Sequence, residues 1–175
     1  MGHTATSIRL ARKSDASALS ILGGETFTET FGHLYKPEDL ALFLERGHSP
    51  ENYEQVLSDD RSCVWVVEEP DGRLVGFLSA GPCGLPVPDK PMSAGEIQRF
   101  YLYKEFQGGG TGSALFDLAM NFLKENFDHI YLSVYAENYG AQRFYERQGF
   151  VKIHDYHYMV GNQADPEFIM EWNKE

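Results

Sequence analysis

The stretch EIQRFYLYKEFQGGGTGSALF, residues 96–116, decides the fold. It predicts a strand, then a glycine-rich turn, then the start of an amphipathic helix. Glycines leave several backbone N–H groups of such a turn free to point at one spot, and the following helix directs the positive end of its dipole there. The stretch therefore predicts an anion site suited to a pyrophosphate.

Three kinds of phosphate-binding loop can be compared with this turn. A Walker A loop ends in Gly-Lys-Ser/Thr, but Gly112 is followed by Ser113 and no lysine is present. A dinucleotide fingerprint, Gly-x-Gly-x-x-Gly, needs a third glycine where Ser113 or Leu115 stands in the two available registers. The pattern Gln-x-x-Gly-x-Gly is met by Gln107, Gly110 and Gly112, and it is the pattern that fits best.

Length and composition predict one globular domain, residues 1–175. Hydrophobic residues make up 42%, which excludes a disordered chain. The net charge of −11 at pH 7 argues against nucleic acid or an anionic membrane as partners. That charge serves either solubility or the attraction of a cationic substrate. Cys63 and Cys83 form no disulfide framework, and no membrane-spanning run or secretory signal is found, so a cytoplasmic location is expected.

Apolar periodicity predicts a mixed α/β chain. Alternating strands and helices from 97 to 153 imply a partly parallel sheet, whereas a hairpin around the turn 70–72 implies an antiparallel end. Gly23-Gly24 is expected to bend or split the first helix. Expected strands are 7–12, 63–67, 74–78, 97–103, 130–135, 150–153, 156–160 and 167–172, and expected helices lie near 14–31, 37–45, 50–57, 115–123 and 138–149.

Two motifs together resemble the GNAT N-acetyltransferases. The Gln-x-x-Gly-x-Gly turn of that family binds a pyrophosphate, and its preceding strand Leu-Tyr-Val stands here as 100–102. The family pattern Asn-x-x-Ala-x-x-Phe-Tyr-x-x-x-Gly-Phe follows in order. It is met at every position, by Asn138, Ala141, Phe144, Tyr145, Gly149 and Phe150. The resemblance covers 7–172 in element order and is specific over 96–150; it departs at Lys104, where the family often has proline.

The resemblance implies the GNAT fold, a central twisted mixed sheet of about seven strands flanked by helices. Its N-terminal part is antiparallel, and its parallel centre splays where the strands ending at Leu102 and Tyr135 part. Acetyl-CoA is the implied co-substrate, with its pyrophosphate on the turn amides and its pantetheine arm along the preceding strand. The implied coenzyme contacts are Phe100, Tyr101, Leu102, Gln107, Gly108, Gly109, Gly110, Thr111, Gly112, Ser113, Asn138, Ala141 and Tyr145.

The implied reaction moves the acetyl group directly to an amine. Deprotonating an alkyl ammonium at pH 7 costs about 4.6 kcal/mol, so a general base is expected. Glu96 is the candidate base, directly or through water, on one strand face with Gln98, Phe100 and Leu102; a solvated strand-end carboxylate is the alternative. Tyr145 matches the family's acid for the thiolate, with core packing as its alternative. The amide of Leu102 is expected to hold the oxyanion.

The acceptor is expected to be a small primary amine. Glu25 and Glu29 lie four residues apart and form either a cation-binding wall or a solvated acidic face. Residues 25–31, 38–57 and 158–170 look similar to PaiA-type polyamine acetyltransferases, which acetylate spermidine and spermine. A protein N-terminus or lysine is the alternative acceptor, and a non-catalytic acyl-CoA-binding regulator is the alternative of another class. None of the six histidines suggests a metal site. Dimers are common in that family, so a homodimer is allowed.

Overall fold

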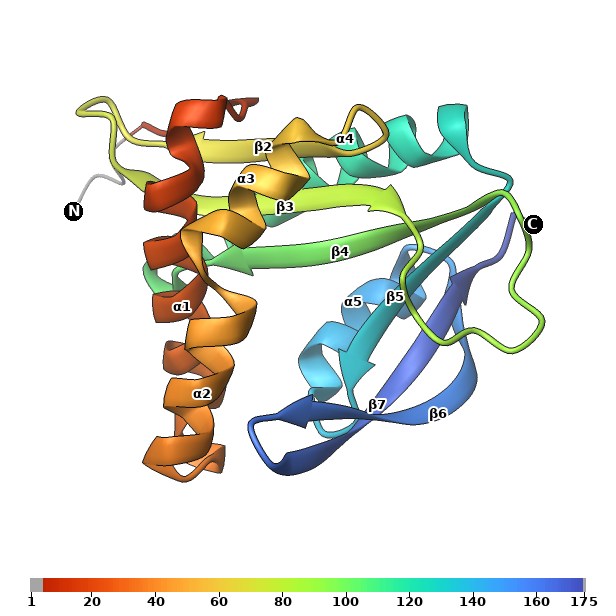
Figure 1. Cartoon of the computed structure of the whole chain (residues 1–175). Helices are drawn as coiled ribbons and strands as arrows, with labels where there is room; N and C mark the ends of the chain where they lie inside the picture. The colour runs from red at the N-terminus through yellow and green to blue at the C-terminus, as the bar shows by residue number, and fades with distance from the viewer. Residues whose placement is uncertain (1–4, 175) are drawn as a thin grey trace.

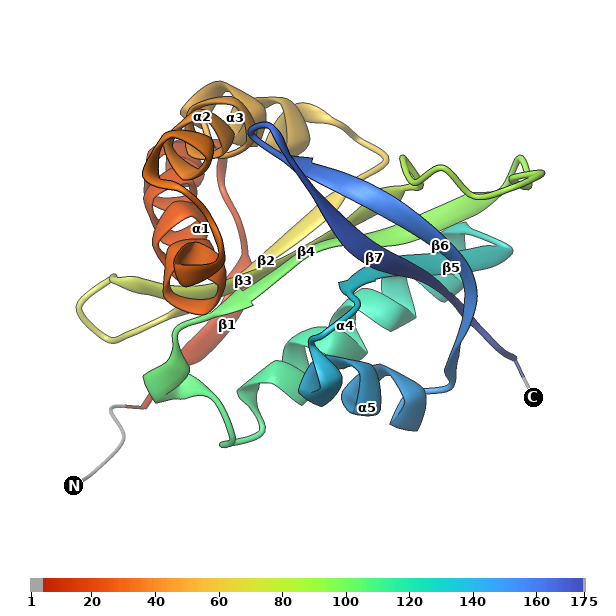
Figure 2. The same cartoon turned by 90° about the horizontal axis from the view of Figure 1, so that it is seen from below.

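Seven strands in the order β1-β2-β3-β4-β5-β7-β6 form one sheet in the computed structural model, which describes residues 5–174. Helices α1, α2 and α3 lie on one face of the sheet, and α4 and α5 lie on the other (Figures 1 and 2). The strands are β1 (Ser7–Leu10), β2 (Cys63–Glu68), β3 (Leu74–Pro82), β4 (Ala94–Leu102), β5 (His129–Tyr135), β6 (Phe150–Val160) and β7 (Gln163–Trp172). The helices are α1 (Ala16–Phe31), α2 (Pro37–Gly47), α3 (Pro50–Ser58), α4 (Thr111–Asn126) and α5 (Tyr139–Arg147).

The sheet is mixed, which confirms the predicted fold class. Strands β4 and β5 are parallel, and every other neighbouring pair is antiparallel. The predicted hairpin is β2–β3, and its turn ends at Gly72, whose φ of 91° is a conformation that glycine adopts without strain. The strands expected at 150–153 and 156–160 form one long strand, β6, which pairs with β7 as a second hairpin.

Strands β4 and β5 separate along their length. They pair only from Ala94↔His129 to Ile97↔Leu132, although β4 continues to Leu102 and β5 to Tyr135. Because no ladder hydrogen bonds join the two strands beyond that point, a gap opens at the centre of the sheet. The splay expected at this position is therefore present.

A bulge in β4 changes which side chains share a face. Ser79 pairs with Arg99 and Ala80 pairs with Ile97, so Gln98 has no partner residue on β3. Ile97 consequently packs in the core under α4, as do Phe100 and Leu102. The prediction that Glu96 shares a face with Phe100 and Leu102 is wrong, because one extra residue reverses the alternation along a strand.

Helix α1 runs unbroken through Gly23-Gly24, contrary to the predicted bend. Gly23 is instead a place of close approach, since a Cβ there would collide with the hydroxyl of Tyr53 and lie 2.7 Å from Nδ1 of His48. These two side chains pack α3 and the α2–α3 junction against α1. On the other face α4 buries Leu115, Phe116, Ala119, Met120 and Leu123, whereas Leu118 of the same helix is 40% exposed.

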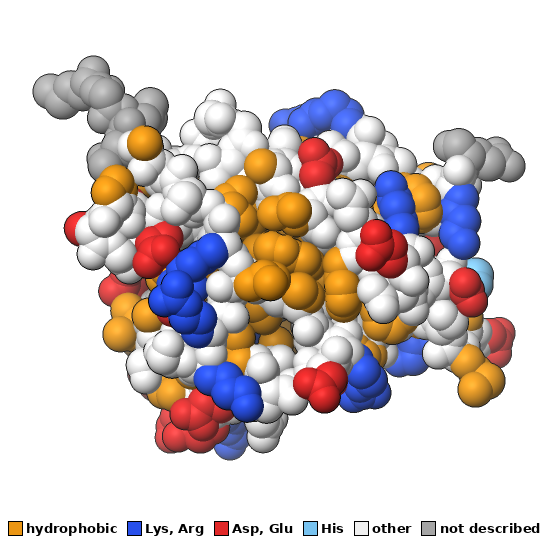
Figure 3. Space-filling model, turned by 90° about the horizontal axis from the view of Figure 1, so that it is seen from above, with side chains coloured by type: hydrophobic (Ala, Val, Ile, Leu, Met, Phe, Trp, Pro, Cys, Tyr) orange, Lys and Arg blue, Asp and Glu red, His pale blue; other side chains and the backbone are white. Residues whose placement is uncertain are grey.

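The face seen from above carries apolar side chains at its centre with charged groups around them (Figure 3). It lies on the β2 side of the sheet, opposite the β6–β7 hairpin (Figure 1). The hairpin tip contacts α2, where the amide of Asn162 donates a 3.0 Å hydrogen bond to Oδ1 of Asp39. The α2–hairpin contact closes one side of the molecule around the gap between β4 and β5.

Candidate active site

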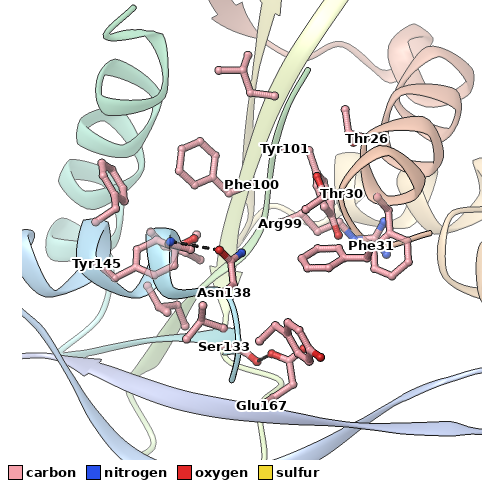
Figure 4. Close-up of a pocket in the computed structure, with 18 of the residues that line it drawn as sticks. Thr26, Thr30, Phe31, Arg99, Phe100, Tyr101, Ser133, Asn138, Tyr145 and Glu167 are labelled. Carbon is pink, nitrogen blue, oxygen red and sulfur yellow. Dashed lines mark hydrogen bonds between the residues drawn. The ribbon is translucent and has the colours of Figure 1, made fainter. Parts of the chain in front are cut away.

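A cleft of about 790 Å³ occupies the gap between β4 and β5 (Figure 4). One wall comes from α1 and α2, the opposite wall from α5 and the glycine turn, and the rest from β4, β5, β6 and β7. In Figure 4, Tyr145 and Asn138 lie on the α5 side, whereas Arg99, Phe31 and Tyr101 lie on the α1 side. The cleft therefore passes between the splayed strands. One chamber lies on the α5 side, and the other lies on the α1 side.

The glycine turn leads into α4. Gly110 is the N-cap of α4 and has a φ of 88°, and Gly108 has a φ of 83°. Within residues 5–174, apart from the adjoining residues of the chain, no heavy atom lies within 4 Å of where a Cβ would stand on residues 108–110. The first amides of a helix have no acceptor within the helix, so those that follow Gly110 are free to bind an anion. The geometry thus fits the expected pyrophosphate turn.

The expected coenzyme contacts fall into two groups. Most of them line the cleft, but Gly109 and Thr111 do not. Gln107 also serves the turn itself, because its Nε2 donates a 2.9 Å hydrogen bond to the carbonyl of Leu102. The expected residues that line the cleft are Phe100, Tyr101, Leu102, Gln107, Gly108, Gly110, Gly112, Ser113, Asn138, Ala141 and Tyr145.

Helix α5 positions Tyr145. The side chain of Asn138 caps this helix by accepting a 3.3 Å hydrogen bond from the amide of Ala141. Burial, with a smaller effect of Glu167, raises the pKa of Tyr145 to about 12, so its phenol is protonated at neutral pH. Its ring lies 6.0 Å from that of Phe116, and its hydroxyl has no hydrogen-bond partner within 5–174. Tyr145 therefore packs in the core and keeps a proton available to the cleft.

Glu96 lines the cleft from β4. It is 9% exposed, and its Oε1 accepts a 2.9 Å hydrogen bond from the amide of Gly84. Burial raises the pKa of Glu96 to about 7, and the hydrogen bond from Gly84 opposes that rise. A carboxyl with this pKa can exchange protons near neutral pH.

A second carboxyl, Glu167 of β7, was not predicted from the sequence. Ser133 of β5 donates a 2.9 Å hydrogen bond to its Oε2, and Oγ of Ser133 also lies 2.6 Å from the hydroxyl of Tyr156. Burial raises the pKa of Glu167 to about 7. Sequence periodicity placed Glu167 at the start of a strand but carried no signal that its side chain enters the cleft.

Arg99 is another cleft residue that the sequence did not single out. Its Nη1 donates to the hydroxyl of Tyr53 at 2.6 Å and to Nδ1 of His48 at 3.0 Å, and its Nη2 donates to the carbonyl of Gly47. Its guanidinium lies over the Tyr53 ring, 4.8 Å from the centroid. Arg99 thus ties β4 to the α2–α3 junction at the α1 side of the cleft.

The structure does not bring Glu25 and Glu29 into the cleft. Both are exposed on α1; Glu25 accepts a hydrogen bond from the hydroxyl of Tyr103, and the backbone carbonyl of Glu29 accepts one from Nζ of Lys104 at 3.1 Å. The face of α1 that does line the cleft carries Thr26, Phe27, Thr30 and Phe31. The acidic side chains of the cleft are Glu96, Asp165 and Glu167. An acceptor wall built from Glu25 and Glu29 stays a prediction.

Within residues 5–174, no group of three or more His, Cys, Asp or Glu side chains is arranged to hold a metal ion. No helix in this range has the length and apolar character needed to cross a bilayer.

Known proteins resemble this chain, some over most of its length and one over less than half of it. An uncharacterised N-acetyltransferase of Lactobacillus delbrueckii subsp. lactis is 26% identical over 96% of this chain and 97% of its own. The peptidyl-lysine N-acetyltransferase YiaC of Escherichia coli is 28% identical over 94% of this chain and 95% of its own. A probable spermine N(1)-acetyltransferase of Bacillus subtilis subsp. natto is 34% identical, over 46% of this chain and 54% of its own.

The fold also has solved counterparts. The PaiA N-acetyltransferase of Thermoplasma acidophilum, crystallised with coenzyme A, superposes with a TM-score of 0.73 at 21% identity, covering 97% of this chain and 99% of that one. The sequence profile of the acetyltransferase (GNAT) family matches residues 25–150, the part that holds β4, the glycine turn, α4, β5 and α5. The chain therefore belongs to the acetyltransferase (GNAT) family and is an acetyl-CoA-dependent N-acetyltransferase.

Proposed function

We propose that the chain acts as one catalytic domain that transfers the acetyl group of acetyl-CoA directly to a small primary amine. The observation that carries this proposal is the continuity of the cleft, which runs from the glycine turn to a chamber lined by carboxyl groups. Neither Cys63 nor Cys83 lines the cleft, and burial raises the pKa of Cys83 to about 11. A protonated thiol outside the cleft favours direct transfer over a cysteine-bound intermediate.

The coenzyme end is proposed to follow the glycine turn. The free amides after Gly110 would bind the pyrophosphate, with Gln107, Gly108, Gly112 and Ser113 around it. The edge of β4 left unpaired beyond Ile97 would bind the pantetheine arm as an added strand, beside Asn138 and Ala141. Gly109 and Thr111 do not line the cleft, so we propose that they contact the pyrophosphate only through their backbone amides.

The chemistry removes two protons from the acceptor ammonium and supplies one to the coenzyme sulfur. A carboxylate takes a proton from the ammonium, and the neutral amine attacks the thioester carbonyl to form a tetrahedral intermediate. Its oxyanion accepts from a strand amide, proposed to be that of Leu102. The C–S bond then breaks, Tyr145 gives its proton to the leaving thiolate, and the tyrosinate takes the second proton from the acetylated nitrogen. Glu96 and Glu167 are the two candidate bases, because both line the cleft with pKa values of about 7.

Glu167 is the candidate favoured by position. The charge of Glu167 contributes to the raised pKa of Tyr145, whereas the charge of Glu96 does not. Each carboxyl group has one oxygen that accepts a hydrogen bond, from the amide of Gly84 in Glu96 and from the hydroxyl of Ser133 in Glu167, so the effect on Tyr145 decides between them. We therefore propose Glu167 as the base and Glu96 as a carboxyl that assists through water.

Two classes of acceptor that the sequence analysis raised, a polyamine and a protein lysine, each have some support. A polyamine suits the acidic chain and the three cleft carboxyl groups, and the spermine acetyltransferase relative supports it over part of the chain. A protein lysine is supported by the peptidyl-lysine relative. The test is a thiol-release assay with acetyl-CoA across polyamines, amino acids and peptides. Turnover with a small amine supports the proposal; binding of acetyl-CoA without thiol release from any amine would show a non-catalytic regulator instead.

A further inference from the structure

Arg99 places a positive charge on the α1 side of the cleft, the part proposed to receive the acceptor amine. No carboxylate of residues 5–174 forms an ion pair with it. Its three hydrogen-bond acceptors are the Tyr53 hydroxyl, Nδ1 of His48 and the carbonyl of Gly47, all of them uncharged groups. Within 5–174 it forms no ion pair. By contrast, Arg9, whose side chain is 20% exposed, pairs with both Asp15 and Glu68 at 2.8 Å. A half-buried guanidinium without a carboxylate is unusual in this molecule and costs desolvation free energy.

The side chains that contact Arg99 are uncharged at neutral pH, so they cannot balance its positive charge. Burial, and then the charge of Arg99 itself, lowers the pKa of His48 to about 3, so the imidazole is neutral. Burial raises the pKa of Tyr53, so the phenol stays protonated. Both rings are buried, at 4% exposure each. The charge of Arg99 is therefore held in place by rigid neutral partners.

Arg99 also keeps donors for a ligand. A guanidinium has five N–H donors, and the protein uses three of them, two on Nη1 and one on Nη2. Nε and the second N–H of Nη2 have no acceptor in the described part of the chain. Because Arg99 lines the cleft, a carboxylate bound there would receive charge-assisted hydrogen bonds in a fixed geometry.

The negative charge of the chamber lies elsewhere. Glu167 sits beside Ser133, away from Arg99 (Figure 4). Burial dominates its raised pKa, and Arg99 is not among the groups that shift it. Aromatic side chains also line this cleft, namely Phe27, Phe31, Phe43, Tyr101 and Tyr158. The cleft thus offers a cationic group, an acidic group in a separate place and apolar rings.

We propose that the acceptor is a small amino acid or a close analogue, whose carboxylate binds Arg99 and whose amine faces Glu167. This inference rests on the proposed function and narrows its substrate class. The aromatic lining favours an apolar or long aliphatic side chain on that acceptor. A polyamine has no group for Arg99 and meets a like charge there, which disfavours it.

Matched acceptor pairs test the inference. Each pair contains an amino acid and the amine left after loss of its carboxyl group: lysine and cadaverine, ornithine and putrescine, phenylalanine and phenethylamine. The wild-type protein should acetylate the acid member with a kcat/KM about 10- to 100-fold higher, because a charge-assisted hydrogen bond is lost in the other member. The methyl ester of each acid should behave as the amine does.

Substitution of Arg99 supplies the second arm. Arg99→Gln should abolish the preference within each pair while the KM for acetyl-CoA stays within about 3-fold of wild type. Arg99→Lys keeps the positive charge but loses the paired N–H donors of the guanidinium, so it should retain part of the preference for the acid member. Tyr53→Phe is the matched control, because it removes one neutral partner of Arg99 and leaves its charge; the preference should persist.

Three results would overturn the inference: equal or better turnover of the decarboxylated members, an unchanged preference in Arg99→Gln, or efficient acetylation confined to peptides that lack a free carboxylate. In the first two cases a small amine is still acetylated, so the proposed function stands. In the third case transfer to an amine stands, but the small acceptor does not. Absence of thiol release with every amine, while acetyl-CoA binds, overturns the proposed function itself.

Discussion

Ser133 and Glu167 join two strands at the floor of the cleft through a hydrogen bond of 2.9 Å from the serine Oγ to Oε2 of the carboxyl group. Because the serine proton is used in this bond, the hydroxyl of Tyr156, 2.6 Å from Oγ, donates to Ser133. The second oxygen of Glu167 has no hydrogen-bond partner within 5–174. The chain Tyr156–Ser133–Glu167 thus orients one carboxyl oxygen and leaves the other for a substrate.

Glu167→Gln should lower kcat by about 10²- to 10⁴-fold, because the amide cannot take a proton from the ammonium. The wild-type rate should fall as pH drops below about 7, where Glu167 becomes protonated, and the variant should lose this dependence. The measurement is kcat and kcat/KM by thiol release between pH 5.5 and 9. Equal kcat and an unchanged pH limb in the variant would assign the base to Glu96, and Glu96→Gln would then show the loss.

Ser133→Ala is the matched variant for this chain of hydrogen bonds. The hydrogen bond from Ser133 favours the ionised form of Glu167, so its loss should raise the pKa of Glu167 further. The acidic limb of the rate profile should therefore move to higher pH, with kcat at pH 9 close to that of the wild type. A limb that stays in place would show that the bond does not tune Glu167.

Glu96 should make the stability of the protein depend on pH. Its pKa is raised from 4.5 to about 7 on folding, so the folded state resists its ionisation. The free energy of unfolding should fall as pH rises from 4.5 through 7, by about 3 kcal/mol from this group. Glu96→Gln should flatten that fall and be the more stable protein at pH 8. Urea unfolding at pH 5 and pH 8 measures both, and parallel wild-type and variant curves would contradict the assignment.

Tyr145→Phe should lower kcat by about 10²- to 10⁴-fold while leaving the KM for acetyl-CoA near its wild-type value. The fold should survive, because the ring contacts with Phe116 and Phe144 remain. Tyr139→Phe, on the same helix but 61% exposed, is the control and should keep full activity. Steady-state kinetics and thermal unfolding of both variants provide the check, and a fully active Tyr145→Phe would remove Tyr145 as the acid.

Gly110→Val should raise the KM for acetyl-CoA by about 10-fold or more, because a β-branched residue resists a φ of 88° and distorts the anion-binding turn. Gly72→Val imposes the same backbone strain at a φ of 91° in the β2–β3 turn, away from the cleft. It should lose stability but keep its KM. Binding of acetyl-CoA, measured by calorimetry, separates the two effects; equal affinities for both variants would remove the turn from the coenzyme site.

Local patterns were sufficient for the coenzyme half of the molecule. The glycine turn before α4, the Asn138 cap of α5 and the order of strands and helices depend on residues within a few positions of one another. Such signals are present in the sequence before any tertiary contact forms. Periodicity therefore predicted the mixed sheet, and the resemblance carried by the two motifs predicted its splayed centre. Tyr145 and Glu96 both line the cleft, and their roles as acid and base stay predictions.

The acceptor half depends on contacts between distant parts of the chain. Ser133 meets Glu167 across 34 positions and Arg99 meets His48 across 51. The bulge at Gln98 reverses the alternation of β4, and the packing of α1 turns Glu25 and Glu29 away from the cleft. Strand register and helix rotation decide these placements, because a shift of one residue moves a side chain to the opposite face. The sequence alone determined the glycine turn and the helix start that are proposed to hold the coenzyme, and only the tertiary structure decided which charged groups line the rest of the cleft.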